Sequence, residues 1–117
     1  MPRDARAYLR DIAEACDAIR DAVAGVDLEA YKASRLVRSS VEREFITIGE
    51  AAAALSRTAP IMFDDITQAR RIVDFRNQLT HEYPSVDDEL VWAIIEHDVE
   101  PLRGEVAALL DEALPDD

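Results

Sequence analysis

Apolar residues recur every three or four positions along most of this chain, and this spacing constrains the fold more than any other sequence feature. The first stripe follows Asp4, which can cap a helix, and ends before Gly25, which suits a helix C-terminus. Its members are Tyr8, Ile12, Ala15, Ile19 and Val23. No segment long enough to be a strand alternates between apolar and polar residues. The pattern therefore predicts an all-α protein.

Further stripes of the same spacing, separated by helix-breaking residues, predict how many helices follow. The expected segments are 28–32, 34–56, 64–82 and a closing stretch from 87–88 onward, with a break at 58–63. The third major helix ends before Pro84, because proline disfavours helical geometry at the preceding residue. Pro101 either kinks the closing helix or stands in the first turn of a final one. We expect one domain over 1–117, a compact bundle of four or five helices.

The charge of the chain is unevenly distributed. A formal net charge of −12 argues against a dedicated nucleic-acid binder, whose affinity rests on cationic contacts to phosphate. Residues 32–76 nevertheless carry eight basic and six acidic groups, whereas residues 77–117 carry one basic and twelve acidic groups. The arginines of the middle segment lie on ordinary solvated helix faces or form a local surface that attracts phosphate. They are Arg35, Arg38, Arg43, Arg57, Arg70, Arg71 and Arg76.

Nothing in the sequence predicts a membrane or secreted protein. No apolar run approaches the ~18 residues that a membrane-spanning helix needs. The first residues carry charges where a signal peptide would be apolar. The single cysteine, Cys16, cannot form an internal disulfide, which fits a reducing compartment, and its apolar neighbours predict a packed core thiol. We expect a cytoplasmic protein without membrane contact.

The segment Arg-Asn-Gln-Leu-Thr-His-Glu-Tyr, residues 76–83, concentrates the polar side chains that could carry chemistry. A zinc site needs three or four closely spaced ligands, and the chain has only two histidines, His81 and His97, so we expect no metal site. The acidic pairs at 64–65 and 87–88 are expected to cap helix N-termini rather than to bind a metal. The segment 76–83 is therefore the candidate site.

Helical geometry limits how this segment can assemble a site. Arg76 and Tyr83 are seven residues apart and share a face, whereas His81 lies roughly 140° around the helix from Arg76. These side chains could converge if the helix loosened before Pro84, or a symmetric dimer could bring two copies of the segment together. We favour the dimer, because one arginine and one histidine make a small active site.

These residue types suit cleavage of RNA by transesterification. Neutral His81 can take the proton of a 2′-hydroxyl, and its protonated form can donate to the leaving 5′-oxygen. Arg76 can hold the phosphate and stabilise its developing charge, and Asn77 could orient either partner. Because the 2′-oxygen is an internal nucleophile, no metal is needed and DNA should not be cut. In the purely structural alternative, His81 caps the helix, Arg76 forms a surface ion pair and Tyr83 packs half-buried.

The same segment fits a known pattern: arginine, polar residue, three further residues, histidine, any residue, tyrosine. Segments 40–45, 48–52, 86–87, 91–92, 94–95 and 98–102 match in the expected order. With them, the chain resembles the HEPN superfamily over most of its length. It specifically resembles the HepT-like branch of toxins that are paired with minimal nucleotidyltransferase antitoxins.

The resemblance implies a HEPN-like helical bundle that dimerises with its motifs facing each other, and no cofactor. Arg76 and His81 match the catalytic pair, and Asn77 matches the polar residue beside the arginine. Tyr83 matches the tyrosine that the antitoxin modifies with AMP (AMPylation), which neutralises the toxin. The implied partners are an RNA substrate, a second copy and the antitoxin, with which a larger hetero-oligomer could form. A bulky anionic group beside Arg76 would occupy the phosphate site.

Three features complicate this interpretation. Glu82 stands where relatives often have a small residue, and its carboxylate would raise the pKa of His81 or repel RNA. Glu50 on the long helix could pair with an arginine near the site or be an ordinary solvated residue. The acidic C-terminal third would suit a basic partner, which favours a second hypothesis. In that hypothesis the chain is a non-catalytic helical subunit that binds a nucleotidyltransferase and is modified by it.

Overall fold

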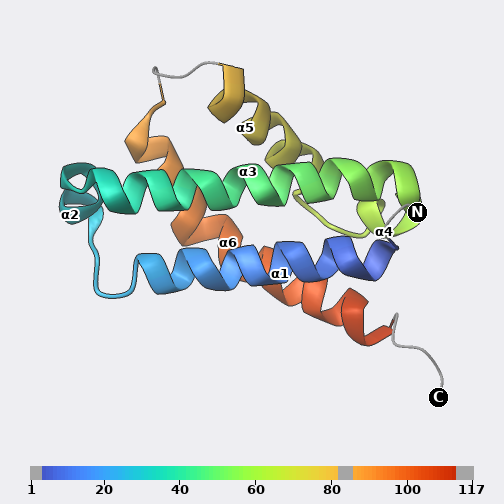
Figure 1. Cartoon of the computed structure of the whole chain (residues 1–117). Helices are drawn as coiled ribbons and strands as arrows, with labels where there is room; N and C mark the ends of the chain where they lie inside the picture. Colours follow the sequence, from blue (N-terminus) through green and yellow to red (C-terminus); the bar gives the residue numbers. More distant parts are fainter. Residues whose placement is uncertain (1–3, 82–85, 113–117) are drawn as a thin grey trace.

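The computed structural model describes residues 4–81 and 86–112, and these ranges form six α-helices and no strand (Figure 1). The helices are α1 (Ala5–Ala22), α2 (Leu28–Ala33), α3 (Arg35–Thr58), α4 (Pro60–Asp64), α5 (Ala69–His81) and α6 (Asp88–Glu112). Four of them are long, and α2 and α4 are short connecting helices of 6 and 5 residues. The all-α prediction is confirmed, and the candidate segment begins on α5, the third of the long helices.

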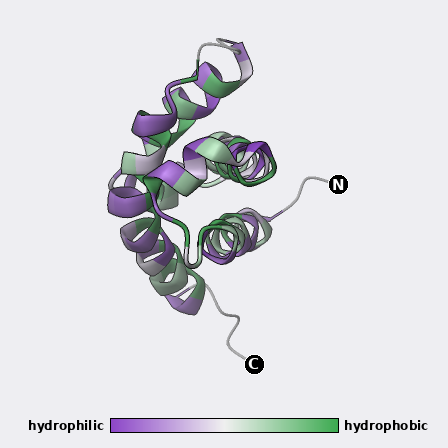
Figure 2. Cartoon of the chain, turned by 90° about the vertical axis from the view of Figure 1, so that its left-hand side faces the viewer, coloured by the Kyte–Doolittle hydropathy of each residue, from purple (hydrophilic) through white to green (hydrophobic). Residues whose placement is uncertain are grey.

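The long helices form two layers. α1 and α3 lie side by side, and Figure 2, which views them along their axes, shows α5 and α6 together along one side of that pair. Within the second layer the two helices have different partners: α5 packs mainly on α3, whereas α6 packs mainly on α1. The position of α5 therefore depends on its contact with α3.

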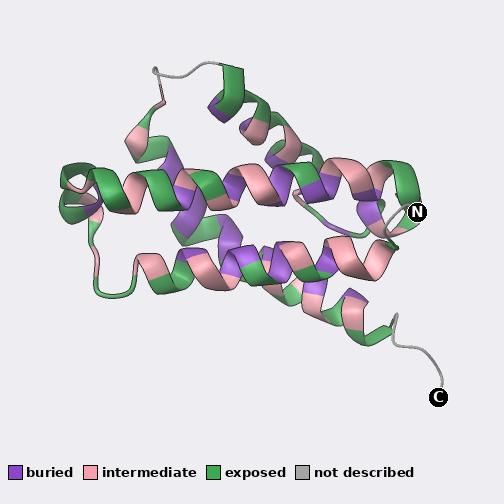
Figure 3. Ribbon diagram, viewed as in Figure 1, coloured by how far each residue is buried: buried purple, intermediate pink, exposed green. Residues whose placement is uncertain are grey.

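The core lies between these layers, and each long helix contributes the face that its apolar spacing predicts (Figure 3). Leu9 and Ile12 of α1, with Ile48 and Leu55 of α3, are fully buried. Cys16 is also fully buried, and burial raises the pKa of its thiol to about 12. The prediction of a packed core thiol is confirmed, because this cysteine stays protonated and inaccessible at neutral pH.

Two predicted boundaries around α4 are wrong. The expected break at 58–63 contains α4, which begins at Pro60 because proline is tolerated in the first turn of a helix. The acidic pair 64–65 does not cap the next helix: the backbone N–H of Asp65 donates to the carbonyl oxygen of Ile61 (3.2 Å) and so completes the end of α4. A turn then separates these residues from the start of α5.

The start of α6 agrees with its prediction. The Asp87 carboxylate accepts hydrogen bonds from the backbone N–H groups of Glu89 (3.0 Å) and Leu90 (3.3 Å), as a helix N-cap does. Pro101 lies inside α6, which continues to Glu112 without a second helix start. Of the two alternatives for Pro101, the position in the first turn of a final helix is therefore wrong, and the residue belongs to the closing helix itself.

Ion pairs attach α6 to the rest of the bundle. Four join its acidic residues to basic residues of α1, α2, α3 and α5: Arg20–Glu100 (3.4 Å), Lys32–Glu89 (3.4 Å), Arg38–Asp88 (3.8 Å) and Arg71–Asp98 (3.7 Å). In a fifth pair the basic residue is on α6 and the acidic residue is on α1. Arg103 of α6 donates two hydrogen bonds to the Asp17 carboxylate (3.1 and 3.2 Å), which lowers the pKa of Asp17. Part of the acidic charge of the C-terminal third is therefore neutralised within the fold.

Glu42 should make the stability of the protein depend on pH. Burial, together with the nearby Asp88 carboxylate, raises the pKa of Glu42 above its ordinary 4.5, and Arg38 opposes this only in part. Between the unfolded and folded pKa values the native state binds more protons, so stability falls as the pH rises through that window. Glu42→Gln should therefore raise the melting temperature at pH 7.5 and lose this advantage at pH 4. An equal gain at both pH values would contradict the assignment.

Candidate active site at the C-terminal end of α5

α5 carries three of the predicted site residues and is a regular α-helix as far as His81. Asn77 and His81 are exposed, whereas Arg76 is half-buried against α3. Because the helix does not loosen between Arg76 and His81, these two side chains point to different sides of α5. Glu82 and Tyr83 lie outside the described residues. One copy of the chain therefore does not bring Arg76 and His81 onto one face.

The half-buried position of Arg76 depends on a glycine. A Cβ added to Gly49 of α3 would lie 2.2 Å from Cβ and 2.6 Å from Cγ of Arg76, far inside van der Waals contact. Gly49 is buried in the middle of the helix, where glycine costs about 0.5–1 kcal/mol relative to alanine. The missing side chain lets the stem of Arg76 pack directly on the α3 backbone. Gly49 thus allows α5 to approach α3 closely at Arg76.

Gly49 is the residue that sequence reasoning missed. It stands in the segment 48–52 that carries the family resemblance, but no role follows from that match alone. A signal was present, because an isolated glycine inside a long helical pattern usually has a packing reason. The sequence did not show that Arg76 would be the residue packed against it.

The guanidinium of Arg76 is charged and incompletely satisfied. Its Nε is buried and has no hydrogen-bond partner, and none of the ion pairs between described residues includes this arginine. Glu50, the candidate supporting residue, follows Gly49 but is exposed and forms no ion pair with any described arginine. In this structure Glu50 is a solvated helix residue, and a role in activity stays a prediction. Arg76 is thus a cation available to an anionic ligand.

Packing holds the rest of α5 in place. The rings of Phe75 and Phe45 meet edge to face, with centroids 5.2 Å apart, and fix α5 on α3. Arg71 reaches the buried carboxylate of Asp98 on α6 (3.7 Å). Near the end of the helix, the Thr80 hydroxyl donates to the carbonyl oxygen of Arg76 (3.1 Å). The segment therefore begins on a well-packed helix, which suits a site that needs fixed geometry.

The two interpretations of the arginines in the middle segment both find support. Arg38 and Arg71 are paired with carboxylates of α6. Among the described residues the others have no ion pair: Arg35, Arg43, Arg57, Arg70 and Arg76. They all belong to α3 or α5, the two helices that meet at Gly49. Unpaired arginines on these two helices can raise the local concentration of an anionic substrate.

Metal ligands do not gather in the part of the chain that the structure describes, where no group of three or more His, Cys, Asp or Glu residues could hold an ion. His97, the second histidine, is exposed on α6 and belongs to a different helix from His81. Of the described helices, none is both long enough and apolar enough to cross a membrane.

The all-α bundle is of the kind that HEPN-type proteins have. The model of a family described as "Ribonuclease HepT-like" matches residues 12–109, and the chain belongs to this HepT-like family. No solved structure matches the chain.

Several proteins with ribonuclease names are similar over nearly their whole length. "Putative RNase MJ1380" from Methanocaldococcus jannaschii is 29% identical over 104 residues, which cover 89% of this chain and 94% of that protein. "Probable ribonuclease HepT" from Thermococcus cleftensis is 28% identical over 109 residues, covering 93% and 98%. "Putative RNase TTE0752" from Caldanaerobacter subterraneus is 24% identical over 107 residues, covering 92% and 95%.

Proposed function

We propose that this chain is a metal-independent endoribonuclease whose catalytic groups are Arg76 and His81. The observation that carries the proposal is the environment of Arg76, packed on Gly49 with its charge unpaired among the described residues. His81 follows on the same helix and is exposed, so it can reach a substrate from solvent. Membership of the HepT-like ribonuclease family supports the choice of RNA as the substrate.

The chemistry needs one base, one acid and one cation. His81 removes the proton of the 2′-hydroxyl, and the 2′-oxygen attacks the adjacent phosphorus. The bond from phosphorus to the 5′-oxygen breaks, and a protonated histidine gives its proton to that oxygen. The products are a 2′,3′-cyclic phosphate and a 5′-hydroxyl. Arg76 stabilises the negative charge that accumulates on the phosphoryl oxygens, and Asn77 orients the reacting groups.

A symmetric dimer would complete this site. Within one chain a regular helix separates the directions of Arg76 and His81, so a single copy offers only one of them to a given phosphate. Two copies facing each other across a two-fold axis would place two arginines and two histidines around one cleft. The second histidine could then act as the acid while the first acts as the base.

The proposal includes regulation at Tyr83 by a partner nucleotidyltransferase of a toxin–antitoxin pair. Tyr83 follows Arg76 by seven residues in the sequence, and we expect an AMP group there to bring a phosphate close to the arginine. Incubation with that partner and ATP should add adenylyl groups to the parent chain, as measured by intact mass. Tyr83→Phe should lose the addition, whereas Tyr31→Phe should keep it because Tyr31 is fully buried. Unchanged addition to Tyr83→Phe would place the acceptor elsewhere.

A second candidate function rests on the acidic charge of the C-terminal third. In this alternative the chain is a non-catalytic subunit that holds a basic nucleotidyltransferase. The exposed acidic residues Glu96 and Asp111 on α6, which form no ion pair with any described residue, would suit such a partner.

One assay separates the two functions. Partner-free protein in EDTA should cleave RNA and leave DNA of the same sequence intact, because DNA lacks the attacking hydroxyl. Products ending in a cyclic phosphate, detected by mass spectrometry, would identify transesterification. If no RNA is cut in any sequence context, the catalytic proposal is wrong and the binding function is favoured. If EDTA abolishes cleavage, the metal-independent mechanism is wrong.

A further inference from the structure

A hollow of 470 Å³ opens between α3, α4 and the first half of α5. It lies along the same contact between α3 and α5 as the proposed site. Ala53, which lines it, is one helical turn beyond Gly49, and Val73 is about one turn before Arg76. The hollow therefore begins roughly 5 Å along the helices from the arginine that we assign to the scissile phosphate. This is the distance scale of a neighbouring nucleotide.

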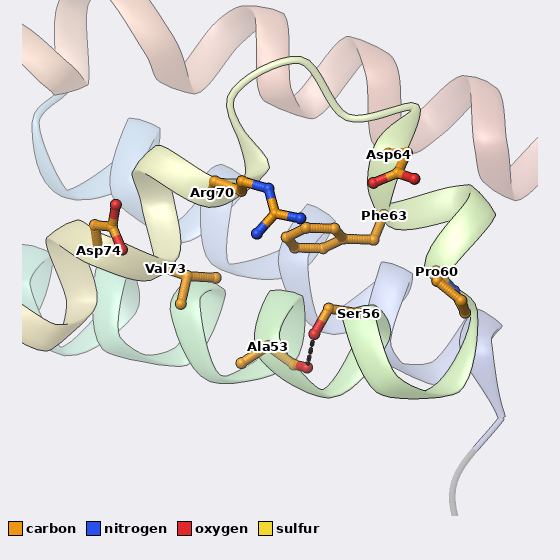
Figure 4. Close-up of a pocket in the computed structure, with 8 residues that line it drawn as sticks. All are labelled: Ala53, Ser56, Pro60, Phe63, Asp64, Arg70, Val73 and Asp74. Atoms are coloured by element: carbon orange, nitrogen blue, oxygen red, sulfur yellow. Dashed lines mark hydrogen bonds between the residues drawn. The ribbon is translucent and has the colours of Figure 1, made fainter.

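The side chains around the hollow combine a flat cation with two carboxylates. Figure 4 shows the guanidinium of Arg70 over the Phe63 ring, with its central carbon 5.7 Å from the ring centroid. Phe63 is 5% exposed, so its ring is a fixed surface beside the guanidinium, while Arg70 itself remains exposed. Asp64 and Asp74 stand on either side of this pair (Figure 4). Among the described residues neither carboxylate has an ion-pair partner.

The charge of the lining selects the kind of ligand. One cation and two carboxylates leave a formal charge of −1, which disfavours a phosphate. The apolar side chains Ala53 and Val73 suit a flat, uncharged group. An arginine plane is a common stacking surface for an unstacked RNA base, and a carboxylate accepts hydrogen bonds from an exocyclic amino group such as that of cytosine. A nucleobase fits all three requirements.

We propose that this hollow is a subsite for the base next to the cleaved phosphate, stacked on Arg70 and held by Asp64 and Asp74. The inference rests on the proposed ribonuclease function. It adds a preference at the flanking position: cytosine, adenine and guanine carry an exocyclic amino group that can donate a hydrogen bond to the carboxylates, and uracil does not. Each such hydrogen-bonded pair discriminates between bases by about tenfold.

Binding can be tested without any cleavage. Isotope-labelled protein is titrated with cytidine or with uridine, and the methyl signals of Ala53 and Val73 are followed by NMR. Cytidine should shift both signals and bind about tenfold more tightly than uridine. In the double variant Asp64→Asn, Asp74→Asn the ratio should fall to about one, because an amide offers both a donor and an acceptor and pairs with either base. The matched control Asp21→Asn, on exposed α1 surface, should keep the parental ratio.

Cleavage provides the second arm. Two RNAs are compared that differ only in having C or U on one side of a single scissile bond. The parent chain should cut the RNA with C about tenfold faster than the RNA with U. Rates or affinities that are equal for C and U, or nucleoside shifts away from Ala53 and Val73, would overturn the subsite. A chain that binds cytidine selectively but cuts no RNA would refute the ribonuclease proposal alone. A chain that cuts RNA without base preference would refute the subsite alone.

Discussion

Replacing His81 by alanine should lower the rate of RNA cleavage about 10²- to 10⁴-fold, the usual contribution of a general acid–base group. The fold should be unaffected, because the His81 side chain is exposed and forms no hydrogen bond or ion pair with another described residue. Initial rates on a fluorescent RNA in EDTA, with thermal melts followed by circular dichroism, measure both effects.

The chain offers a matched control in its second histidine. His97 is also exposed but lies on α6, so His97→Ala should cleave at the parental rate. Arg76→Lys is the companion variant: it keeps the positive charge but loses the planar fork that holds a phosphate with two hydrogen bonds, and its rate should also fall sharply. If His81→Ala cleaves as fast as the parent, or if His97→Ala is equally slow, the assignment of the base is wrong.

Gly49→Ala should destabilise the protein by about 1–3 kcal/mol, the usual cost of forcing an extra group into packed space. The added methyl would lie 2.2 Å from Cβ of Arg76, so α5 must move away from α3. Because Arg76 moves with α5, RNA cleavage should fall even at temperatures where the variant is folded. Urea unfolding gives the stability, and initial rates under native conditions give the activity.

Gly104→Ala is the control for this change. Gly104 also lies inside a helix, but a Cβ there would meet no atom within 4 Å. This variant should gain about 0.5–1 kcal/mol, because alanine is the better helix former, and should keep its activity. The two glycine substitutions therefore have opposite expected signs. A stabilising Gly49→Ala would show that α3 and α5 can separate without cost.

A double variant distinguishes packing from catalysis. Gly49→Ala combined with Arg76→Gly removes both atoms of Arg76 that the new methyl would meet within 3 Å. The double variant should regain part of the stability lost by Gly49→Ala but should not regain cleavage. Recovery of cleavage would mean that Arg76 is not needed for the reaction.

Much of the local structure could be predicted from the sequence. The apolar spacing predicted the four long helices, and Asp4 and Asp87 accept the capping hydrogen bonds that their positions suggest. Around α4 the prediction failed because two acidic residues before an apolar stripe look the same whether they start one helix or end another. In the structure these residues end a helix, because the backbone N–H of Asp65 donates a hydrogen bond to the carbonyl oxygen of Ile61 in α4. A turn that ends a helix of 5 residues leaves almost no periodic signal.

The sequence by itself determined the fold class, the helix that carries the candidate segment and the residue types in that segment. These depend on local spacing and on chemistry that each residue carries with it. Only the tertiary structure decided that Gly49 lies under Arg76, that Asp98 pairs with Arg71, and that Arg70 covers Phe63 beside an open hollow. Periodicity shows which face of a helix is buried, but the neighbour of that face is set by how whole helices pack. The environment of Arg76, on which the proposed function depends, is therefore a property of the contact between α3 and α5.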